Sequence, residues 1–166
     1  MSNDQSFREA QEAALRLLSY RPRSEAELRT RLNRRFPSTA VDQVLRSLKQ
    51  RSLVNDQEFA KLWAESRDRQ KPRSAAAIRR ELVSKGVAPD TAASAASIVD
   101  DEESAMRAGA RFARRMADAD FASFHRRLQG HLQRRGYSSG VTRRTVSRLW
   151  EEKSHGSARS IYADAE

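Results

Sequence analysis

The side chains best suited to chemistry in this 166-residue chain are its arginines. A guanidinium offers a planar fork of hydrogen-bond donors that fits phosphates and carboxylates alike. Neighbouring residues of a helix point about 100° apart, so an adjacent pair covers a wide face, whereas Arg127 and Arg134 share one face. The density favours binding over a merely solvated helix face. Four adjacent pairs lie in the last third: Arg114-Arg115, Arg126-Arg127, Arg134-Arg135 and Arg143-Arg144.

The formal net charge of +10 is unevenly distributed along the chain. Residues 1–55 hold 11 basic and 6 acidic side chains, residues 56–105 hold 8 and 10, and residues 106–166 hold 13 and 6. A basic, acidic, basic order suggests a polyanionic partner, or a partner with complementary charge along its length. The alternative interpretation is a basic surface that serves solubility alone.

The other polar groups do not form an enzymatic constellation. His125 and His131 are six residues apart and so do not share a helix face, and no acidic pair lies near them at metal-ligand spacing. The acidic run Asp100–Glu103 fits the start of a helix better than a divalent-ion site, because the helix dipole favours carboxylates there. Cysteine is absent and no glycine-rich phosphate loop occurs. We expect no metal, no cofactor and no catalysis.

We expect neither a secretory signal peptide nor a membrane span in this sequence. No apolar run approaches the roughly 18 residues of a membrane span. The stretch MSNDQSFREA lacks the apolar region of a signal peptide. We expect a soluble, cytoplasmic protein without membrane contact.

A repeat of 50 residues organises the chain. Pro22-Arg23-Ser24 recurs as Pro72-Arg73-Ser74, and several apolar and basic positions recur twice. Such a period indicates tandem helical modules. The positions in register are Leu28, Ile78 and Leu128; Leu32, Leu82 and Leu132; Arg35, Lys85 and Arg135; and Phe36, Gly86 and Gly136.

Apolar spacings of three and four residues predict three helices in each module. The Ser24-x-x-Glu27 pattern predicts a capping box, and Gly86 and Gly136 are expected to be left-handed C-caps. The predicted fold is all-α, an elongated row of three tandem three-helix repeats at 6–52, 53–100 and 101–152, with a disordered tail at 153–166. Residues expected in the interior include Ala10, Ala14, Leu28, Leu32, Val41, Val44, Leu45, Leu48, Phe59, Leu62, Trp63, Ile78, Leu82, Met106, Phe112, Met116, Phe121, Phe124, Leu128, Leu132, Val146, Leu149 and Trp150.

Three short motifs resemble those of the RecX family, bacterial modulators of the recombinase RecA. They are SEAELRTRL from Ser24, LVNDQEFA from Leu53 and IRRELVSKGV from Ile78. In that family these motifs occur in this order and at nearly this spacing. The resemblance covers about residues 7–152 and is weakest in the third module.

Two departures from the family pattern lie at helix ends. The family often has Gly-Pro before the second helix of module two, where this chain has Ser74-Ala75. It often has Gly after the basic residue of module one, where this chain has Phe36 and then Pro37. Both departures put the local cap geometry in question more than the assignment.

The resemblance implies a regulator of recombination and of the SOS response to DNA damage. Such proteins bind along the groove of the RecA filament on single-stranded DNA, touch neighbouring protomers, and lower recombinase, ATPase and coprotease activities. We expect a monomer, with weak direct DNA binding as a secondary property. From the repeated second helices, beside the apolar stripe, we expect these residues to form the binding face: Arg29, Arg31, Arg79, Arg80, Lys85, Arg127, Arg134 and Arg135.

Two further hypotheses compete with this one. Three-helix modules resemble helix-turn-helix units, so a basic regulator that acts directly on DNA is the main alternative. Its binding should weaken with salt, with a slope of about −0.7 to −0.9 per neutralised phosphate. The third hypothesis is an enzyme, and no motif in the sequence supports it. The sequence leaves open whether the partner is inhibited or mildly stimulated.

Overall fold

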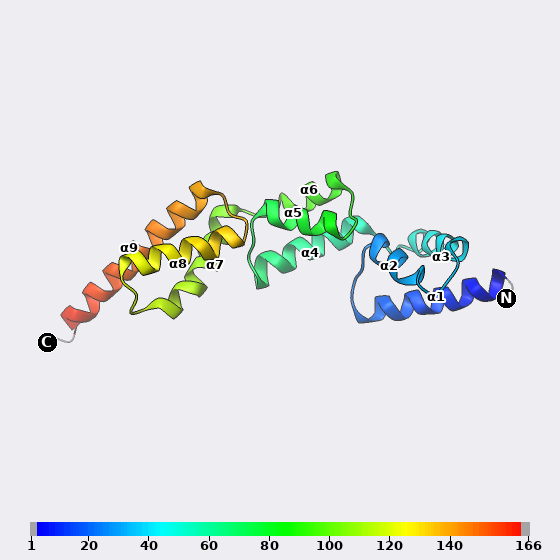
Figure 1. Ribbon diagram of the computed structural model, residues 1–166, viewed down its shortest axis with the longest axis horizontal. Coiled ribbons are helices and arrows are strands. Elements are labelled where there is room, and N and C mark those ends of the chain that lie inside the picture. Colours follow the sequence, from blue (N-terminus) through cyan, green and yellow to red (C-terminus); the bar gives the residue numbers. More distant parts are fainter. Residues whose placement is uncertain (1–2, 164–166) are drawn as a thin grey trace. The chain divides into compact units, whose positions relative to one another are not determined.

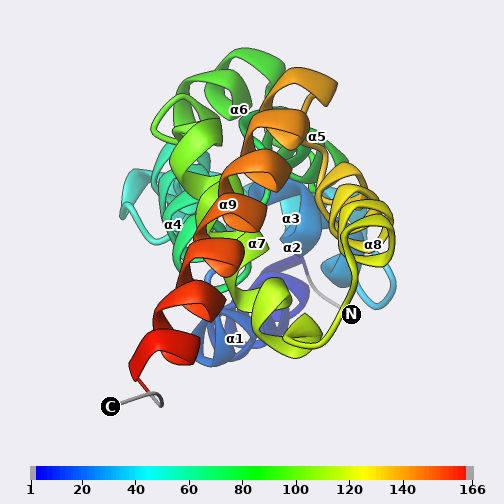
Figure 2. The ribbon, with the colours of Figure 1, turned by 90° about the vertical axis from the view of Figure 1, so that its left-hand side faces the viewer.

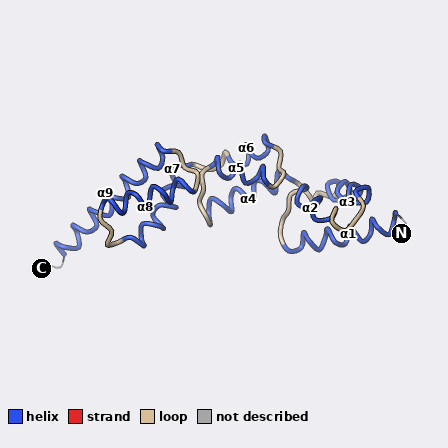
Figure 3. Tube along the Cα trace, viewed as in Figure 1, coloured by secondary structure: helices blue, strands red, loops and turns tan. Residues whose placement is uncertain are grey.

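The computed structural model describes residues 3–163, and the side chains from Asp4 to His155. Within this part the chain forms nine α-helices and one 3₁₀ helix, and it contains no strand (Figure 1, Figure 3). The predicted all-α class is confirmed, with three helices in each of three tandem repeats. The elements are α1 (Asn3–Tyr20), α2 (Glu25–Leu32), α3 (Ser38–Gln50), α4 (Asp56–Gln70), α5 (Ala75–Ser84), α6 (Pro89–Ala96), α7 (Asp101–Ala113), η1 (Arg114–Met116), α8 (Phe121–Arg134) and α9 (Ser139–Ala163).

The predicted helix caps are confirmed. Ser24 Oγ accepts from the Glu27 amide at 3.1 Å, and the Ser24 amide donates to Glu27 Oε2 at 3.2 Å, which completes the capping box. Gly86 and Gly136 have φ of 81° and 89°, the left-handed conformation that L residues rarely adopt. Asp100 caps α7 by accepting from the Glu102 and Glu103 amides. The acidic run therefore begins a helix, as its position predicts.

The helices are distributed over two compact units. Unit 1 consists of the described residues up to Ala64 together with Arg79–Ala96, and unit 2 consists of Glu65–Ile78 together with the described residues from Ser97 onwards. The middle repeat thus contributes to both units. The boundaries of the two compact units therefore differ from the boundaries of the 50-residue sequence repeats.

In unit 1, α1, α2 and α3 pack around one apolar cluster (Figure 1). Leucines and valines at helical spacing on α2 and α3 meet alanines of α1, which allow the helices to approach closely. The predicted interior of this repeat is confirmed. The cluster consists of Ala10, Ala14, Leu28, Leu32, Val41, Val44, Leu45, Leu48 and Val54.

In unit 2, α7, α8 and α9 pack together around a second cluster (Figure 2). Phe124, Leu128 and Leu132 form its α8 stripe and are fully buried. Tyr137 joins the cluster from the turn after α8, and its hydroxyl lies 2.8 Å from Ser104 Oγ. The other members are Ala105, Ala108, Met116, Val141, Val146 and Leu149.

Two side chains predicted to be interior are exposed instead. Phe121 is 54% exposed and Leu62 is 43% exposed. Phe121 is the first residue of α8, and Cα–Cβ bonds tilt toward the helix N-terminus. Its ring therefore points beyond the end of the stripe, although it touches the edge of Trp150 at a centroid distance of 5.2 Å. On α4, Phe59 and Ala64 are buried and Leu62 lies outside their face.

The predicted disorder of residues 153–166 is wrong for residues 153–163, because α9 continues to Ala163. Lys153 Nζ donates to the Ala119 carbonyl at 2.8 Å and lies 4.7 Å from the centre of the Trp150 ring. Ser154 Oγ also donates to the Trp150 carbonyl. These contacts stabilise α9 beyond Trp150, where the apolar periodicity ends. Residues 164–166 lie outside the described part.

Candidate partner-binding surfaces

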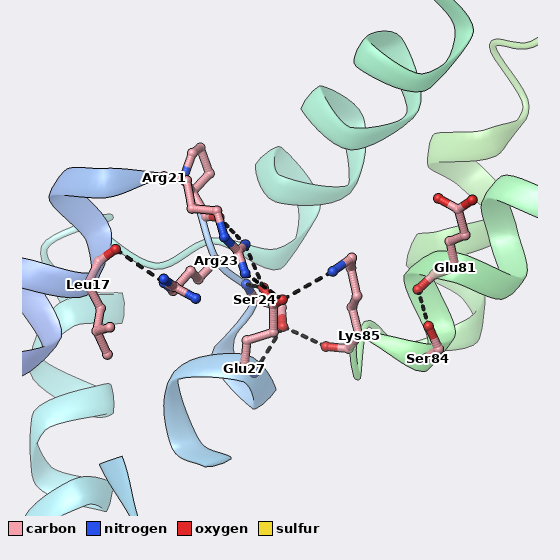
Figure 4. Close-up of polar contacts among 9 residues, drawn as sticks. Leu17, Arg21, Arg23, Ser24, Glu27, Glu81, Ser84 and Lys85 are labelled. Carbon is pink, nitrogen blue, oxygen red and sulfur yellow. Dashed lines mark hydrogen bonds and ion pairs between the residues drawn. The ribbon is translucent and has the colours of Figure 1, made fainter. Parts of the chain in front are cut away.

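The N-terminus of α2 meets the C-terminal turn of α5 in unit 1 (Figure 4). Ser24 Oγ donates to the Lys85 carbonyl at 2.6 Å, and Lys85 Nζ lies 3.1 Å from Glu27 Oε1. A Cβ added at Gly86 would lie 2.2 Å from Ala26 Cβ. Side chains at the start of α2 therefore pack tightly on the main chain of Lys85 and Gly86.

Charge at this contact is largely compensated. Glu27 binds both Arg21, at 3.1 Å, and Lys85. Partial burial acts to raise the pKa of Glu27, but the hydrogen bonds from Arg21 and Lys85 act against it and the net shift is downward. Lys85 Nζ also lies 4.2 Å from the centre of the Trp63 ring. The Lys85 ammonium is thus engaged within the chain.

The corresponding contact in unit 2 uses the residues 50 positions later. The Ser74 amide donates to the Arg135 carbonyl at 3.1 Å, and Arg135 Nη1 donates to the Pro72 carbonyl at 2.9 Å. A carboxylate receives the next amide in both units: Glu25 N donates to Asp56, and Ala75 N donates to Asp101. The same repeat positions therefore meet in both units, but the serine donates through its hydroxyl group in unit 1 and through its amide in unit 2.

The eight residues predicted to bind fall into two groups. Arg29, Lys85 and Arg135 have partners within the chain; Arg29 pairs with Glu25 and Asp42. The rest are exposed and have no ion-pair partner among the described residues. These five are Arg31, Arg79 and Arg80 in unit 1 and Arg127 and Arg134 in unit 2.

Unit 1 carries a basic cleft of about 360 Å³ beside the α2–α5 contact. The structure brings Arg31 and Lys85 together here, whereas Arg29, Arg79 and Arg80 lie outside the lining. The binding hypothesis missed Arg21, Arg23 and Arg34, which also line it. The repeated Pro-Arg-Ser motif was the signal for this segment, since its serine is the Ser24 cap.

A second hollow of unit 1, about 340 Å³ in volume, is lined by both apolar and basic side chains. Phe36 belongs to the lining, at the repeat position that Gly86 and Gly136 occupy. Tyr20 also lines the hollow and is 79% exposed. The basic members are Arg16, Arg31, Arg34 and Arg35, of which only Arg31 was predicted to bind.

Unit 2 carries its own basic cleft, of about 180 Å³, between the α4–α5 loop, α7 and α8. Arg135 lines it, while Arg127 and Arg134 lie outside. The neutral members of the lining are Gln70, Pro72, Ala108 and Phe112. The sequence reasoning did not connect Lys71, Arg111, Arg115 and His131 with Arg135, because these residues come from three separate segments.

Comparison with known proteins identifies the family. Models of the first, second and third three-helix domains of RecX match residues 10–48, 55–95 and 100–146. The chain belongs to the RecX family. The regulatory protein RecX of Amycolatopsis mediterranei (strain U-32) is 33% identical over 166 residues, which span 98% of this chain and 94% of that protein. The regulatory protein RecX of Chlorobium limicola is 34% identical over 149 residues, or 89% and 94% of the two chains.

Solved RecX structures share the fold. The crystal structure of RecX from Lactobacillus salivarius superposes with a TM-score of 0.75, at 19% identity, over 88% of this chain and 97% of that one. A second RecX crystal structure gives a TM-score of 0.73 at 22% identity, over 84% and 72%. The family models confirm the resemblance drawn from three motifs, and the similar proteins are regulatory proteins. None of its described helices is both long and apolar enough to cross a membrane.

One histidine of unit 2 should make the stability of this RecX-family chain depend on pH. Burial, with Arg135, Arg134 and Arg115 nearby, lowers the pKa of His131 from 6.5 to about 4. Between these values the unfolded chain binds a proton that the folded chain does not, so stability should fall as pH decreases from 6.5 toward 4. Urea unfolding at several pH values should show that the free energy of unfolding falls less steeply with decreasing pH in His131→Gln than in the wild type. Equal pH dependence of the two proteins would contradict the role given to His131.

Proposed function

We propose that this protein is a non-enzymatic modulator of the RecA recombinase, and that it acts as an inhibitor. One observation carries the proposal: three RecX domains match in order from residue 10 to residue 146. We further propose that it acts as a cytoplasmic monomer. Its target is the RecA filament on single-stranded DNA, where it limits filament extension and lowers ATPase and coprotease activity.

The proposed mode of binding is along the filament groove, across neighbouring RecA protomers. The support is the presence of exposed, unpaired arginines in both compact units. Two linked binding surfaces convert the second contact into an intramolecular event, which raises avidity without new contacts. A chain that bridges protomers would therefore act at a small fraction of the RecA concentration.

The eight predicted residues have different roles in this proposal. Arg31, Arg79, Arg80, Arg127 and Arg134 contact the filament, because their charges are exposed and uncompensated. Arg29, Lys85 and Arg135 support the helices that present them, because their charged groups already bind Glu25, Glu27 and the Pro72 carbonyl. Guanidiniums suit both an acidic protein surface and the phosphates of bound DNA.

The deciding experiment measures ATP hydrolysis by RecA on single-stranded DNA, with this protein titrated below stoichiometry at fixed salt. We expect a steep fall at a small fraction of the RecA concentration. Arg127→Glu with Arg134→Glu should require about tenfold more protein for the same inhibition, the equivalent of about 1.4 kcal/mol.

The matched control is Arg114→Glu with Arg143→Glu. These residues are also exposed arginines of unit 2, so the change in net charge is the same. The control should inhibit almost as well as the wild type. Equal loss in both double variants would show that only net charge matters, and undiminished inhibition by Arg127→Glu with Arg134→Glu would exclude this surface.

The alternative is a basic regulator that acts on DNA directly. Its support is the net charge of +10 and the basic lining of both clefts. No effect on RecA ATP hydrolysis, with tight DNA binding in a mobility-shift assay, would favour it. Binding in that assay should weaken with salt by about 0.7 log units per tenfold change for each phosphate contacted on a single strand.

A further inference from the structure

The basic cleft of unit 2 gathers charges of one sign from three segments of the chain. Lys71 comes from the α4–α5 loop, Arg111 and Arg115 from α7 and η1, and Arg135 from the end of α8. No carboxylate lines this cleft, whereas Glu27 lines the cleft of unit 1 and binds Lys85 there. Converging cations repel one another, so the arrangement is unfavourable unless an anion enters.

Two of the guanidiniums are held in place before any ligand arrives. Arg111 donates from Nη1 to the Gln70 carbonyl at 3.0 Å and from Nη2 to the Arg69 carbonyl at 3.2 Å. Arg135 donates from Nη1 to the Pro72 carbonyl at 2.9 Å. Carbonyl groups orient these side chains without cancelling their charge. Each guanidinium has five N–H groups, so donors remain for a further acceptor.

His131 adds a neutral donor to the cleft. Its Nε2 accepts from Arg135 Nε at 2.9 Å, so its proton resides on Nδ1. The ring stacks on Phe112 at a centroid distance of 4.1 Å, which fixes its orientation. Burial, with the neighbouring arginines, lowers the pKa of the ring to about 4 and so keeps it uncharged at neutral pH. A fixed imidazole N–H beside several cations is suited to an oxyanion.

We propose that this cleft binds a phosphate group, with Lys71 and Arg115 supplying charge and Arg111, His131 and Arg135 supplying oriented donors. The volume of the cleft is about 180 Å³. One phosphate with part of its hydration shell fits that space. The inference uses unit 2 alone and does not depend on the proposed action on RecA.

The test compares the wild type with a double variant that carries both Lys71→Gln and Arg115→Gln. Both side chains are exposed and form no hydrogen bond or ion pair with the described residues, so removal of their charge relieves repulsion and the variant should fold. Titration with pyrophosphate should shift the His131 ring resonances in the wild type. The dissociation constant for pyrophosphate should be at least about tenfold larger in the variant, because each charge-assisted hydrogen bond to an anion is strong.

The melting temperature provides an independent readout. Without ligand, the double variant should melt at or above the wild-type temperature, and pyrophosphate should stabilise the wild type more. The control Arg114→Gln removes a neighbouring exposed arginine that does not line the cleft, and it should bind pyrophosphate like the wild type. A lower melting temperature for the double variant, with unchanged pyrophosphate binding, would overturn the proposal.

Two sources of phosphate are distinguished by two further titrations. Inorganic phosphate and ATP present terminal phosphate groups, whereas a short oligothymidylate without terminal phosphates presents only backbone diesters. If only inorganic phosphate and ATP shift the His131 resonances in a saturable way, the ligand is a free phosphate or a nucleotide. If the oligonucleotide also shifts them, the ligand is the nucleic-acid backbone. Unmoved His131 resonances with every probe would exclude the site.

Discussion

Alanine in place of Gly86 should destabilise the protein by about 2–5 kcal/mol, as the sum of two costs. The left-handed conformation at φ 81° costs an L residue roughly 1–2 kcal/mol. The added Cβ would also lie 2.2 Å from Ala26 Cβ, far inside any real carbon contact. Since Ala26 belongs to α2, the α5 turn must move away and strain the hydrogen bond between Ser24 and Lys85.

The measurement is urea unfolding of Gly86→Ala, with two companions. Gly130→Ala on α8 meets only the flexible end of Arg134, so it should raise stability by up to about 1 kcal/mol through helix propensity. Ala26→Gly in the Gly86→Ala background removes the clashing methyl group and should restore part of the loss. Simple additivity of the two substitutions would show that the close approach is not the cause.

Truncation of Phe124 to alanine should cost about 3–5 kcal/mol. Phe124 is fully buried in the unit 2 cluster, where its ring lies 5.3 Å from that of Trp150 and 5.9 Å from Lys153 Nζ. The change leaves a cavity that the surrounding helices fill incompletely. The loss should appear as a lower urea midpoint for the unfolding of unit 2.

Phe121→Ala is the matched control for this truncation, since it removes the same ring from the same helix three residues earlier. Phe121 is 54% exposed, so its loss should cost less than about 1 kcal/mol. Tryptophan fluorescence should still change, because both rings touch Trp150. Equal destabilisation by the two substitutions would contradict the burial difference.

Local patterns were sufficient to predict most of the fold. The spacing of Leu28 and Leu32, the capping box at Ser24 and the C-cap at Gly86 each depend on residues within one helix or turn, and all three are confirmed. The helix start after Asp100 follows the same logic. Local sequence determines these features because the hydrogen bonds involved close within a few residues.

Predictions that depended on distant contacts were less successful. Phe121 has the correct spacing for the α8 stripe, but the end of the helix directs its ring outward. The extension of α9 past residue 152 includes a bond from Lys153 to Ala119, 34 residues away. No periodicity in the tail could have indicated that contact.

The candidate surfaces show the same limit. Helical spacing could indicate which arginines lie outside the apolar stripe. Five of the predicted arginines are indeed exposed: Arg31, Arg79, Arg80, Arg127 and Arg134. Spacing could not predict that Lys85 binds Glu27 or that Arg135 binds the Pro72 carbonyl. The unit 2 cleft unites segments up to 65 positions apart, from Gln70 to Arg135, and only the folded chain shows it.

The hydrogen bond from Ser24 to the Lys85 carbonyl has a consequence for the order of events on the ribosome. Its partners are 61 residues apart. At about 5–20 residues per second, the acceptor emerges roughly 3–12 s after the donor. During that interval the capping box with Glu27, only three residues away, can already hold the start of α2. The serine thus stabilises a nascent helix first and joins α5 later through the same hydroxyl group.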